Sequence, residues 1–333
     1  MPGTGEYDYL VTGGAGFIGS HLCEFFLDRG NSVLVLDDLS TGVISNLDGC
    51  VGRDGFGFVE GSVLDEPLTA ELVHRSRGVV HLAAAVGVEN IIRRPVETIE
   101  TNVSGTETVL KAALNTGVPV FIASTSEIYG KSDCVPFRED GDIVLGATSR
   151  SRWSYACSKA MDEFLAFAYW KDKGLPVVVG RLFNTVGPRQ SGRYGMVLPR
   201  FIAQARDGKP LTVFGDGRQT RCFSLVYEVV EAITSLINKP GAVGKVVNIG
   251  STQEISILEL ARRVIRLSGS DSTIELIPYE KAYPGDFEDM LRRVPDVSLL
   301  KSLVGKVPEA DIDEIIRKIL EQRISGSAEK YGE

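Results

Sequence analysis

A glycine-rich turn near the N-terminus constrains the fold more than any other part of the sequence. Gly13, Gly16 and Gly19 follow an apolar run at residues 7–12 and open a stretch with helical periodicity. At such a junction the first glycine permits a tight turn, the second lets the backbone approach a pyrophosphate, and the third lets helix and strand pack closely. The phosphates would face the helix N-terminus, whose free N–H groups bind anions. The turn therefore predicts a dinucleotide-binding β–α–β unit.

The first half of the chain repeats this alternation of strand and helix. Its short apolar runs are "YDYLVTG", "SVLVLDD", "GFGFVEG", "GVVHLAAA", "VPVFIAST" and "LPVVVGR". Such runs are typical of parallel strands that are buried on both faces. Helices are expected from Pro95 to the residue before Gly117, and from about Trp153 to the residue before Gly174. We predict an α/β fold whose residues 1–184 form a Rossmann-type, doubly wound parallel sheet.

The pattern changes beyond about residue 185, where elements become shorter and Gly/Pro turns more frequent. We expect residues 185–325 to form mainly a smaller α/β lobe that binds the substrate, with some of this chain returning to the large domain. Ligands of doubly wound folds bind outside the carboxyl ends of the strands. A cleft is therefore expected where the two parts meet.

Composition excludes several classes of function. With 36 Lys and Arg against 44 Asp and Glu, the net charge is -8, which argues against a nucleic-acid or anionic-membrane surface. No run is long and apolar enough for a transmembrane helix, and we expect no signal peptide. The five cysteines form no Cys-x-x-Cys, and the three histidines show no ligand spacing. We therefore predict a cytoplasmic protein with free thiols and no metal site.

Acidic residues at the end of the second apolar run bear on the choice of cofactor. A carboxylate at Asp37 can bind ribose hydroxyls and repel a 2′-phosphate, which favours NAD over NADP. Asp38 could share that role. The alternative, a glycine-rich turn beside a surface aspartate, stays open on these residues alone.

A tyrosine and a lysine four residues apart, Tyr155 and Lys159, share one face of a predicted helix. A phenol with an unperturbed pKa of about 10 is a poor base until a nearby cation stabilises the phenolate. The ammonium of Lys159 can do this and also hold a ribose. Together with the glycine turn, the pair predicts the general base of a hydride-transfer enzyme, although a solvated helix pair would look the same in isolation.

Several stretches together resemble one family. In order along residues 7–300 they are "TGGAGFIGSH", "ETNVSGT", "STSEIYG", "YACSK" and "GRLFNTVGPR", and they resemble the extended short-chain dehydrogenase/reductases that act on nucleotide-sugars. The resemblance implies a tightly held NAD and a sugar whose ring carbon four loses hydride while Tyr155 takes the hydroxyl proton. It also implies a homodimer formed through helices 95–116 and 153–173. The further cofactor contacts that it implies are Phe17, Ile18, Ser62, Val63, Leu82, Ala83, Ala84, Tyr155 and Lys159.

The same resemblance implies a UDP-sugar substrate. Asn184 and Arg221 would face the diphosphate, Val213 and Phe214 a uracil base, and Arg293 the diphosphate or the sugar. Guanidinium groups suit oxyanions because they bind them in bidentate fashion, although any single arginine could instead be a surface charge. The full set of implied substrate contacts is Val86, Asn184, Val197, Val213, Phe214, Arg221 and Arg293.

Glu127 in "STSEIYG" separates the branches of this family. The 4-epimerases usually carry a small residue there, whereas 4,6-dehydratases and UDP-glucuronate decarboxylases carry a glutamate. Thr125 would bind the keto oxygen in either branch, and Ser126 completes the catalytic set of Tyr155, Lys159, Thr125, Glu127 and Ser126. A plain capping or salt-bridge role for Glu127 is the alternative.

The segments "RWSYACSK" and "GDFEDMLRRVPD" resemble the decarboxylases more closely. The leading prediction is NAD-dependent decarboxylation of UDP-glucuronic acid, with complete or incomplete re-reduction to UDP-xylose. A 4-epimerase of UDP-glucuronate or UDP-glucose comes next, followed by a nucleotide-sugar 4,6-dehydratase. The non-enzymatic alternative is a dinucleotide-sensing regulator, which would need none of Tyr155, Lys159, Thr125 and Glu127.

Two positions depart from the decarboxylase pattern. The loop at residues 85–90 lacks the usual Pro and Tyr and contains Glu89, which would repel a uronate if it pointed inward. Ser62 stands where an aspartate commonly meets the adenine. A loosely held NADH could then leave before re-reduction, so that a 4-keto pentose is released.

Overall fold

A computed structural model describes residues 5–87, 94–150, 152–192, 196–278, 281, 290 and 292–321. Its centre is a seven-stranded sheet in the order β11-β6-β5-β4-β1-β2-β3, with every neighbouring pair parallel. The strands are β1 (Tyr9–Thr12), β2 (Val33–Asp37), β3 (Phe56–Glu60), β4 (Val79–His81), β5 (Val120–Thr125), β6 (Val177–Leu182) and β11 (Lys245–Ile249). The predicted doubly wound fold is thus confirmed.

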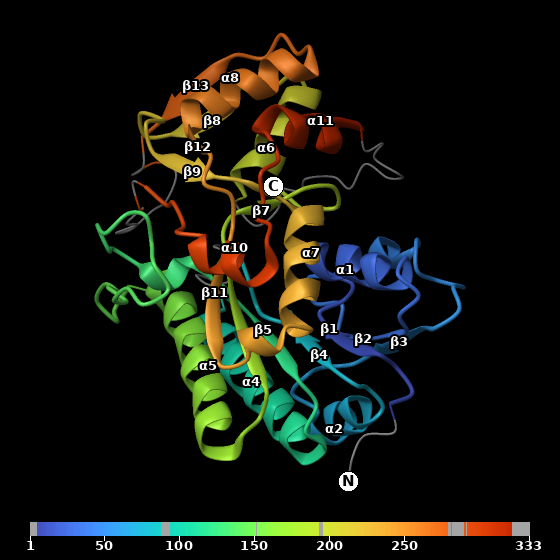
Figure 1. Cartoon of the computed structure of the whole chain (residues 1–333). Coiled ribbons are helices and arrows are strands. Elements are labelled where there is room, and N and C mark those ends of the chain that lie inside the picture. The colour runs from blue at the N-terminus through green and yellow to red at the C-terminus, as the bar shows by residue number, and fades with distance from the viewer. Residues whose placement is uncertain are drawn as a thin grey trace.

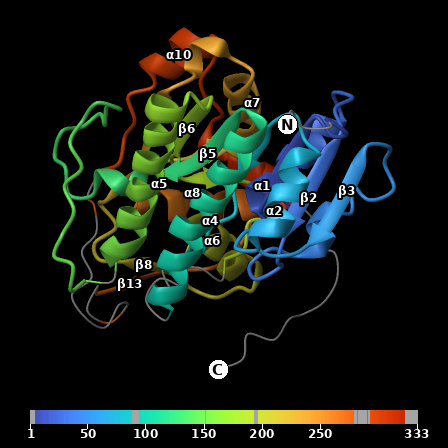
Figure 2. The same ribbon diagram turned by 90° about the horizontal axis from the view of Figure 1, so that it is seen from below.

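Helices cover both faces of this sheet. One face carries α2 (Glu66–His74), α4 (Pro95–Thr116) and α5 (Arg152–Lys173), which lie side by side in Figure 2. The other face carries α1 (Phe17–Leu27), α7 (Val226–Ile237) and α10 (Ser298–Val304) (Figure 1). Helix α4 begins at Pro95 and ends at Thr116. Gly117 caps it, and its φ of 75° lies in the left-handed region that favours glycine.

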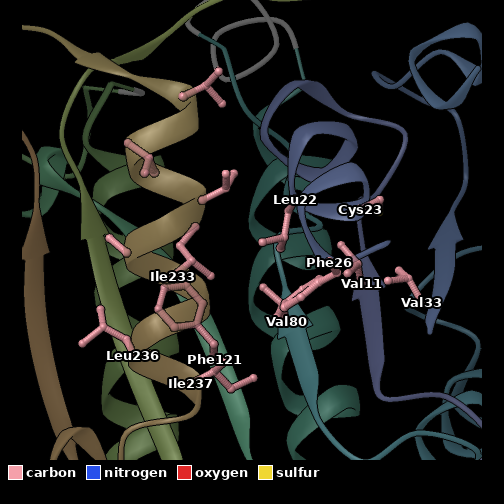
Figure 3. Packing of buried hydrophobic residues seen from close by; sticks show 14 of the residues in the cluster. Val11, Leu22, Cys23, Phe26, Val33, Val80, Phe121, Ile233, Leu236 and Ile237 are labelled. Atoms are coloured by element: carbon pink, nitrogen blue, oxygen red, sulfur yellow. The ribbon is translucent and has the colours of Figure 1, made fainter. Parts of the chain in front are cut away.

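The core consists of two apolar layers, one on each side of the sheet. Alternate residues of β2 belong to different layers, because side chains of a strand point to opposite faces in turn. Val33 and Val35 pack with α1 and α7, whereas Leu34 and Leu36 pack toward α2 and α4. Figure 3 shows the first layer, in which Phe26 and Ile233 belong to α1 and α7.

The smaller lobe surrounds a third apolar cluster. It contains α6 (Val197–Arg206), α8 (Ile257–Ser268) and α11 (Ile312–Glu321), with the strand pairs β8 (Leu211–Phe214) and β13 (Ile274–Ile277), and β9 (Thr220–Cys222) and β12 (Glu254–Ser256). A pair formed by β7 (Thr185–Val186) and β10 (Ser224–Leu225) lies between the lobe and the sheet (Figure 1). Three later elements, α7, β11 and α10, belong to the large domain. Within the described residues, no helix is long and apolar enough to cross a membrane.

Candidate active site

A cavity of about 990 Å³ separates the carboxyl edge of the sheet from the smaller lobe. Its walls include the ends of β1, β2, β5 and β6 on one side, and α6 and β8 on the other. Ligand sites of enzymes commonly occupy concave spaces of this size at a boundary between domains. The predicted cleft is therefore present at the carboxyl ends of the strands.

The glycine turn forms one end of this cavity. Gly13 has a φ of +74°, and a Cβ added there would lie 2.8 Å from the amide nitrogen of Ala83. A Cβ on Gly19 would lie 2.2 Å from the carbonyl oxygen of Gly13. Helix α1 begins after Gly16, and its first residues line the cavity. The backbone thus leaves room for a pyrophosphate at the helix N-terminus.

Asp37 lies beside this turn at the end of β2. Its Oδ2 accepts a hydrogen bond from the amide of Ala15 at 2.8 Å, and its Oδ1 accepts one from the amide of Leu39 at 2.8 Å. Burial raises the pKa of Asp37, and the two backbone hydrogen bonds oppose that shift. Asp38 also lines the cavity and accepts hydrogen bonds from Ser40. The N-terminus of α1, the tight glycine turn and the buried carboxylate of Asp37 together fit NAD.

The remaining residues predicted to contact the cofactor fall into two groups. Those that line the cavity are Phe17, Ile18, Val63, Leu82, Ala83 and Ala84. Ser62 is not among the described cavity-lining residues, although Gly61 and Val63 are. Its Oγ accepts a hydrogen bond from the amide of Leu64 at 3.2 Å, so the hydroxyl is used by its own turn.

Substituting Ser62→Asp is expected to lower the Kd for NAD by about fivefold to tenfold. A carboxylate at this position can accept a hydrogen bond from the adenine amino group, and such bonds contribute about 1 kcal/mol or more. Calorimetric titration with NAD measures the effect, with Ser62→Asn as the control of similar size and no charge. Equal Kd values for the wild type and the aspartate variant would contradict the expectation.

The predicted reactive residues line the same cavity as the glycine turn. Thr125, Ser126, Glu127, Tyr155 and Lys159 all line it. The side chain of Tyr155 is hydrogen-bonded to that of Thr125. Burial raises the pKa of the Tyr155 phenol, and the charge of Glu127 raises it further. The phenol therefore needs a cation before it can act as a base.

Lys159 lies one turn further along α5 and carries that cation. Its side chain is 3% exposed, and its Nζ lies 2.7 Å from Oδ2 of Asp162. The sequence motif gave no indication of this partner. A carboxylate on a helix surface is ordinarily solvated, so only the burial of Asp162 distinguishes it.

Glu127 forms an ion pair that the sequence did not reveal. Its Oε1 lies 3.0 Å from Nη1 of Arg293, a side chain that is 8% exposed. The Nε of Arg293 is buried and has no hydrogen-bond partner in the described part of the chain. The guanidinium therefore lies beside Glu127, with one donor still uncommitted, at the end of the cavity that holds Tyr155.

The predicted substrate residues line the cavity, with one exception. The residues that line it are Val86, Asn184, Val197, Phe214, Arg221 and Arg293. Val213 is fully buried in the core of the smaller lobe. Arg200 was not predicted, and its guanidinium carbon lies 4.2 Å from the centre of the Phe214 ring. Glu89 falls outside the described residues.

Comparison with known proteins gives consistent results. Residues 9–250 match the NAD dependent epimerase/dehydratase family. The chain is 42% identical over 313 residues to a UDP-N-acetyl-alpha-D-glucosaminuronate decarboxylase of Bacillus cytotoxicus, covering 94% of this chain and 96% of that protein. It is 35% identical to UDP-glucuronic acid decarboxylase 1 of Xenopus tropicalis, covering 93% of this chain and 70% of that protein.

A solved structure extends the comparison to the fold. The UDP-glucuronic acid 4-epimerase of Bacillus cereus, in complex with UDP-glucuronic acid and NAD, superposes with a TM-score of 0.85 at 26% identity. The match covers 94% of this chain and 98% of the epimerase.

Proposed function

Because the chain belongs to the NAD-dependent epimerase/dehydratase family, we propose that it decarboxylates a UDP-linked uronic acid, with UDP-glucuronic acid as the substrate predicted from the sequence. The observation that carries this proposal is the buried Arg293 beside Glu127. A guanidinium presents five N–H donors in a fixed fork that matches a carboxylate. Arg293 uses one nitrogen for Glu127 and can offer others to the carboxylate of the sugar.

The residues of the chain supply the acid–base steps. When bound, NAD accepts a hydride from ring carbon four of the sugar. Tyr155, as the phenolate stabilised by Lys159, removes the proton from the hydroxyl on that carbon, and the Thr125 hydroxyl donates to the ketone oxygen that results. The carboxylate is then β to a ketone.

The carbon–carbon bond breaks next. Its electrons move toward the ketone oxygen as carbon dioxide leaves, which produces an enolate between carbons four and five. A proton must then return to carbon five. Glu127 is the acid that we assign to this protonation. It lines the same cavity as Tyr155, and Arg293 holds its Oε1 at 3.0 Å. Return of the hydride to carbon four would give UDP-xylose, whereas loss of the reduced cofactor before that step would release the 4-keto pentose.

UDP-N-acetylglucosaminuronic acid is the second candidate substrate. The Bacillus cytotoxicus relative named for it is the more similar of the two relatives, at 42% against 35% identity. An acetamido group on carbon two does not touch the bonds that break between carbons four and six. Both sugars therefore suit the same reactive residues, and the substituent on carbon two is the variable to test.

The direct experiment incubates purified protein and NAD with UDP-glucuronic acid, UDP-N-acetylglucosaminuronic acid or UDP-glucose, and follows the products by mass spectrometry. We expect loss of carbon dioxide from one or both uronic acids. A product of unchanged mass with a new retention time would instead indicate a 4-epimerase, and loss of water a 4,6-dehydratase. Absorbance of NADH that grows with turnover would indicate release of the keto product.

We also propose a homodimer in the cytoplasm, where the five free cysteines would stay reduced. Helices α4 and α5 lie side by side on the outer face of the large domain (Figure 2) and expose large apolar side chains. Phe164 is 66% exposed and Met161 46% on α5, and Val96 is 66% exposed on α4. Large apolar side chains exposed on two neighbouring helices are typical of an interface.

Substituting Phe164→Glu is therefore expected to convert the dimer into a monomer, because a charge at the centre of an apolar interface loses its hydration without gaining a partner. Light scattering coupled to size-exclusion chromatography measures the mass. Leu276→Glu is the matched control, since Leu276 is 55% exposed on β13 in the smaller lobe. A dimer that survives Phe164→Glu would place the interface elsewhere.

A further inference from the structure

A buried carboxylate that the steps above do not use lies against the lysine of the site. Asp162 has a fully buried side chain, and its Oδ2 lies 2.7 Å from Nζ of Lys159. Burying a carboxylate costs several kcal/mol unless a partner compensates. The charge of Asp162 acts directly on the Lys159 ammonium, which is the group that stabilises the Tyr155 phenolate.

A chain of hydrogen bonds leads from the glycine turn toward this carboxylate. The amide of Ala83 donates to Oγ1 of Thr12 at 3.3 Å, and that Oγ1 lies 2.8 Å from Nδ1 of His81. Nε2 of His81 lies 3.2 Å from Oγ1 of Thr106, whose side chain also faces Asp162. These residues connect β1, β4 and α4 to α5.

The tautomer of His81 sets the direction of donation along this chain. Burial lowers the pKa of His81 to about 3, so the imidazole is neutral and has a single N–H. If Thr12 donates to Nδ1, then Nε2–H donates to Thr106, and the Thr106 hydroxyl is free to donate toward Asp162. Each donor of the chain then has an acceptor. Burial raises the pKa of Asp162, and Lys159 and Thr106 oppose that shift.

Neighbouring charges leave Lys159 as the counter-charge of Asp162. Glu163, the next residue, is bound to Arg181 at 2.8 Å and accepts a hydrogen bond from Ser124 at 2.5 Å. In the described part of the chain, the groups that act on Asp162 include Lys159 and Glu163 on α5 and Thr106 on α4, with neutral His81 behind Thr106 on β4. The charge of Asp162 also reaches Tyr155 on α5. The Asp162 carboxylate therefore pairs with the Lys159 ammonium at 2.7 Å.

We propose that Asp162 is a positioning residue that holds the buried Lys159 ammonium and limits how strongly that ammonium favours the phenolate form of Tyr155. A carboxylate 2.7 Å from the ammonium offsets part of its positive charge. Without Asp162 beside it, the ammonium would attract the phenolate more strongly. The inference rests on the proposed function, in which Tyr155 is the base and Lys159 its cation.

Substituting Asp162→Asn keeps the shape and removes the charge. The Tyr155 phenol should then lose its proton at lower pH, because the charge of Asp162 raises its pKa. In a profile of kcat/KM against pH, the acid limb follows the deprotonation of Tyr155. That limb is therefore expected to move to lower pH, by about one unit, since a nearby charge shifts a pKa by about one unit or more.

A second readout needs no sugar. In NAD-loaded protein carrying tyrosine labelled with ¹³C at Cζ, the Tyr155 resonance is assigned by its loss in Tyr155→Phe. Its titration midpoint is expected to fall in Asp162→Asn. The fall should be smaller when Lys159→Met is also present, because only the direct effect of the Asp162 charge on the phenol then remains. The control Thr106→Val removes the hydroxyl without changing a charge and should move the midpoint less. Asp162→Glu restores the charge and should return the midpoint toward that of the wild type.

The outcomes separate the possible failures. A folded Asp162→Asn protein whose pH profile and Tyr155 midpoint match those of the wild type would overturn the inference and leave Asp162 as a structural residue. Movement of either to higher pH would overturn it as well. If the asparagine variant does not fold, Asp162→Ser serves the same measurements. If no uronic acid is turned over, the proposed function fails, while the Tyr155 midpoint still tests the role of Asp162.

Discussion

Replacing Tyr155 with phenylalanine is expected to lower kcat by about 10²- to 10⁴-fold, the range that general acid–base catalysis contributes. The substitution removes one oxygen, the atom that exchanges the proton with the hydroxyl on carbon four. The ring remains to pack against its surroundings. Binding of NAD should therefore change little, because the glycine turn and Asp37 that fit the cofactor are untouched.

Steady-state rates and a calorimetric NAD titration on the same preparation test this. The matched control is Tyr227→Phe, which removes the same atom from a tyrosine of α7 that packs against His21 of α1 and does not line the cavity. Its kcat should stay close to that of the wild type. A Tyr155→Phe enzyme that keeps kcat within tenfold would show that another group accepts the proton.

The fold was predictable where local pattern and burial agree. Fully apolar runs gave β1, β2, β4, β5 and β6 because a parallel strand buried on both faces must be apolar throughout. The seventh strand, β11, was not predicted at its place in the sheet. It comes from the C-terminal half, and its pairing with β6 is a tertiary contact that no neighbouring residue encodes.

The site was predictable to the same extent. Helical spacing alone brings Tyr155 and Lys159 to one face of α5. Val213 and Phe214 came from one motif, but consecutive strand residues point to opposite faces, so that only Phe214 lines the cavity. Contact between Glu127 and Arg293 joins segments far apart in the sequence, and no local pattern could pair them.

Replacing Arg293 with alanine is expected to lower kcat/KM for the uronic acid by about 10²- to 10³-fold. Truncating one partner of a buried, hydrogen-bonded charge pair costs about 2–5 kcal/mol, and each 1.4 kcal/mol is a factor of about ten. Here the loss would include the donors for the sugar carboxylate and the partner that holds Glu127. Arg293→Lys keeps the charge without the fork and should fall between the wild type and the alanine variant.

The neighbouring arginine provides a matched control. Arg292 has a 58% exposed side chain and pairs with Glu254 at 2.8 Å, outside the cavity, so Arg292→Ala should leave kcat/KM nearly unchanged. Binding of UDP-glucose, which has the diphosphate but no carboxylate, separates the two sites predicted for Arg293. If Arg293 holds the carboxylate, Arg293→Ala should leave the Kd for UDP-glucose near that of the wild type. If the Kd for UDP-glucose instead rises by the same factor by which kcat/KM for the uronic acid falls, the guanidinium binds the diphosphate. Another residue must then recognise the carboxylate.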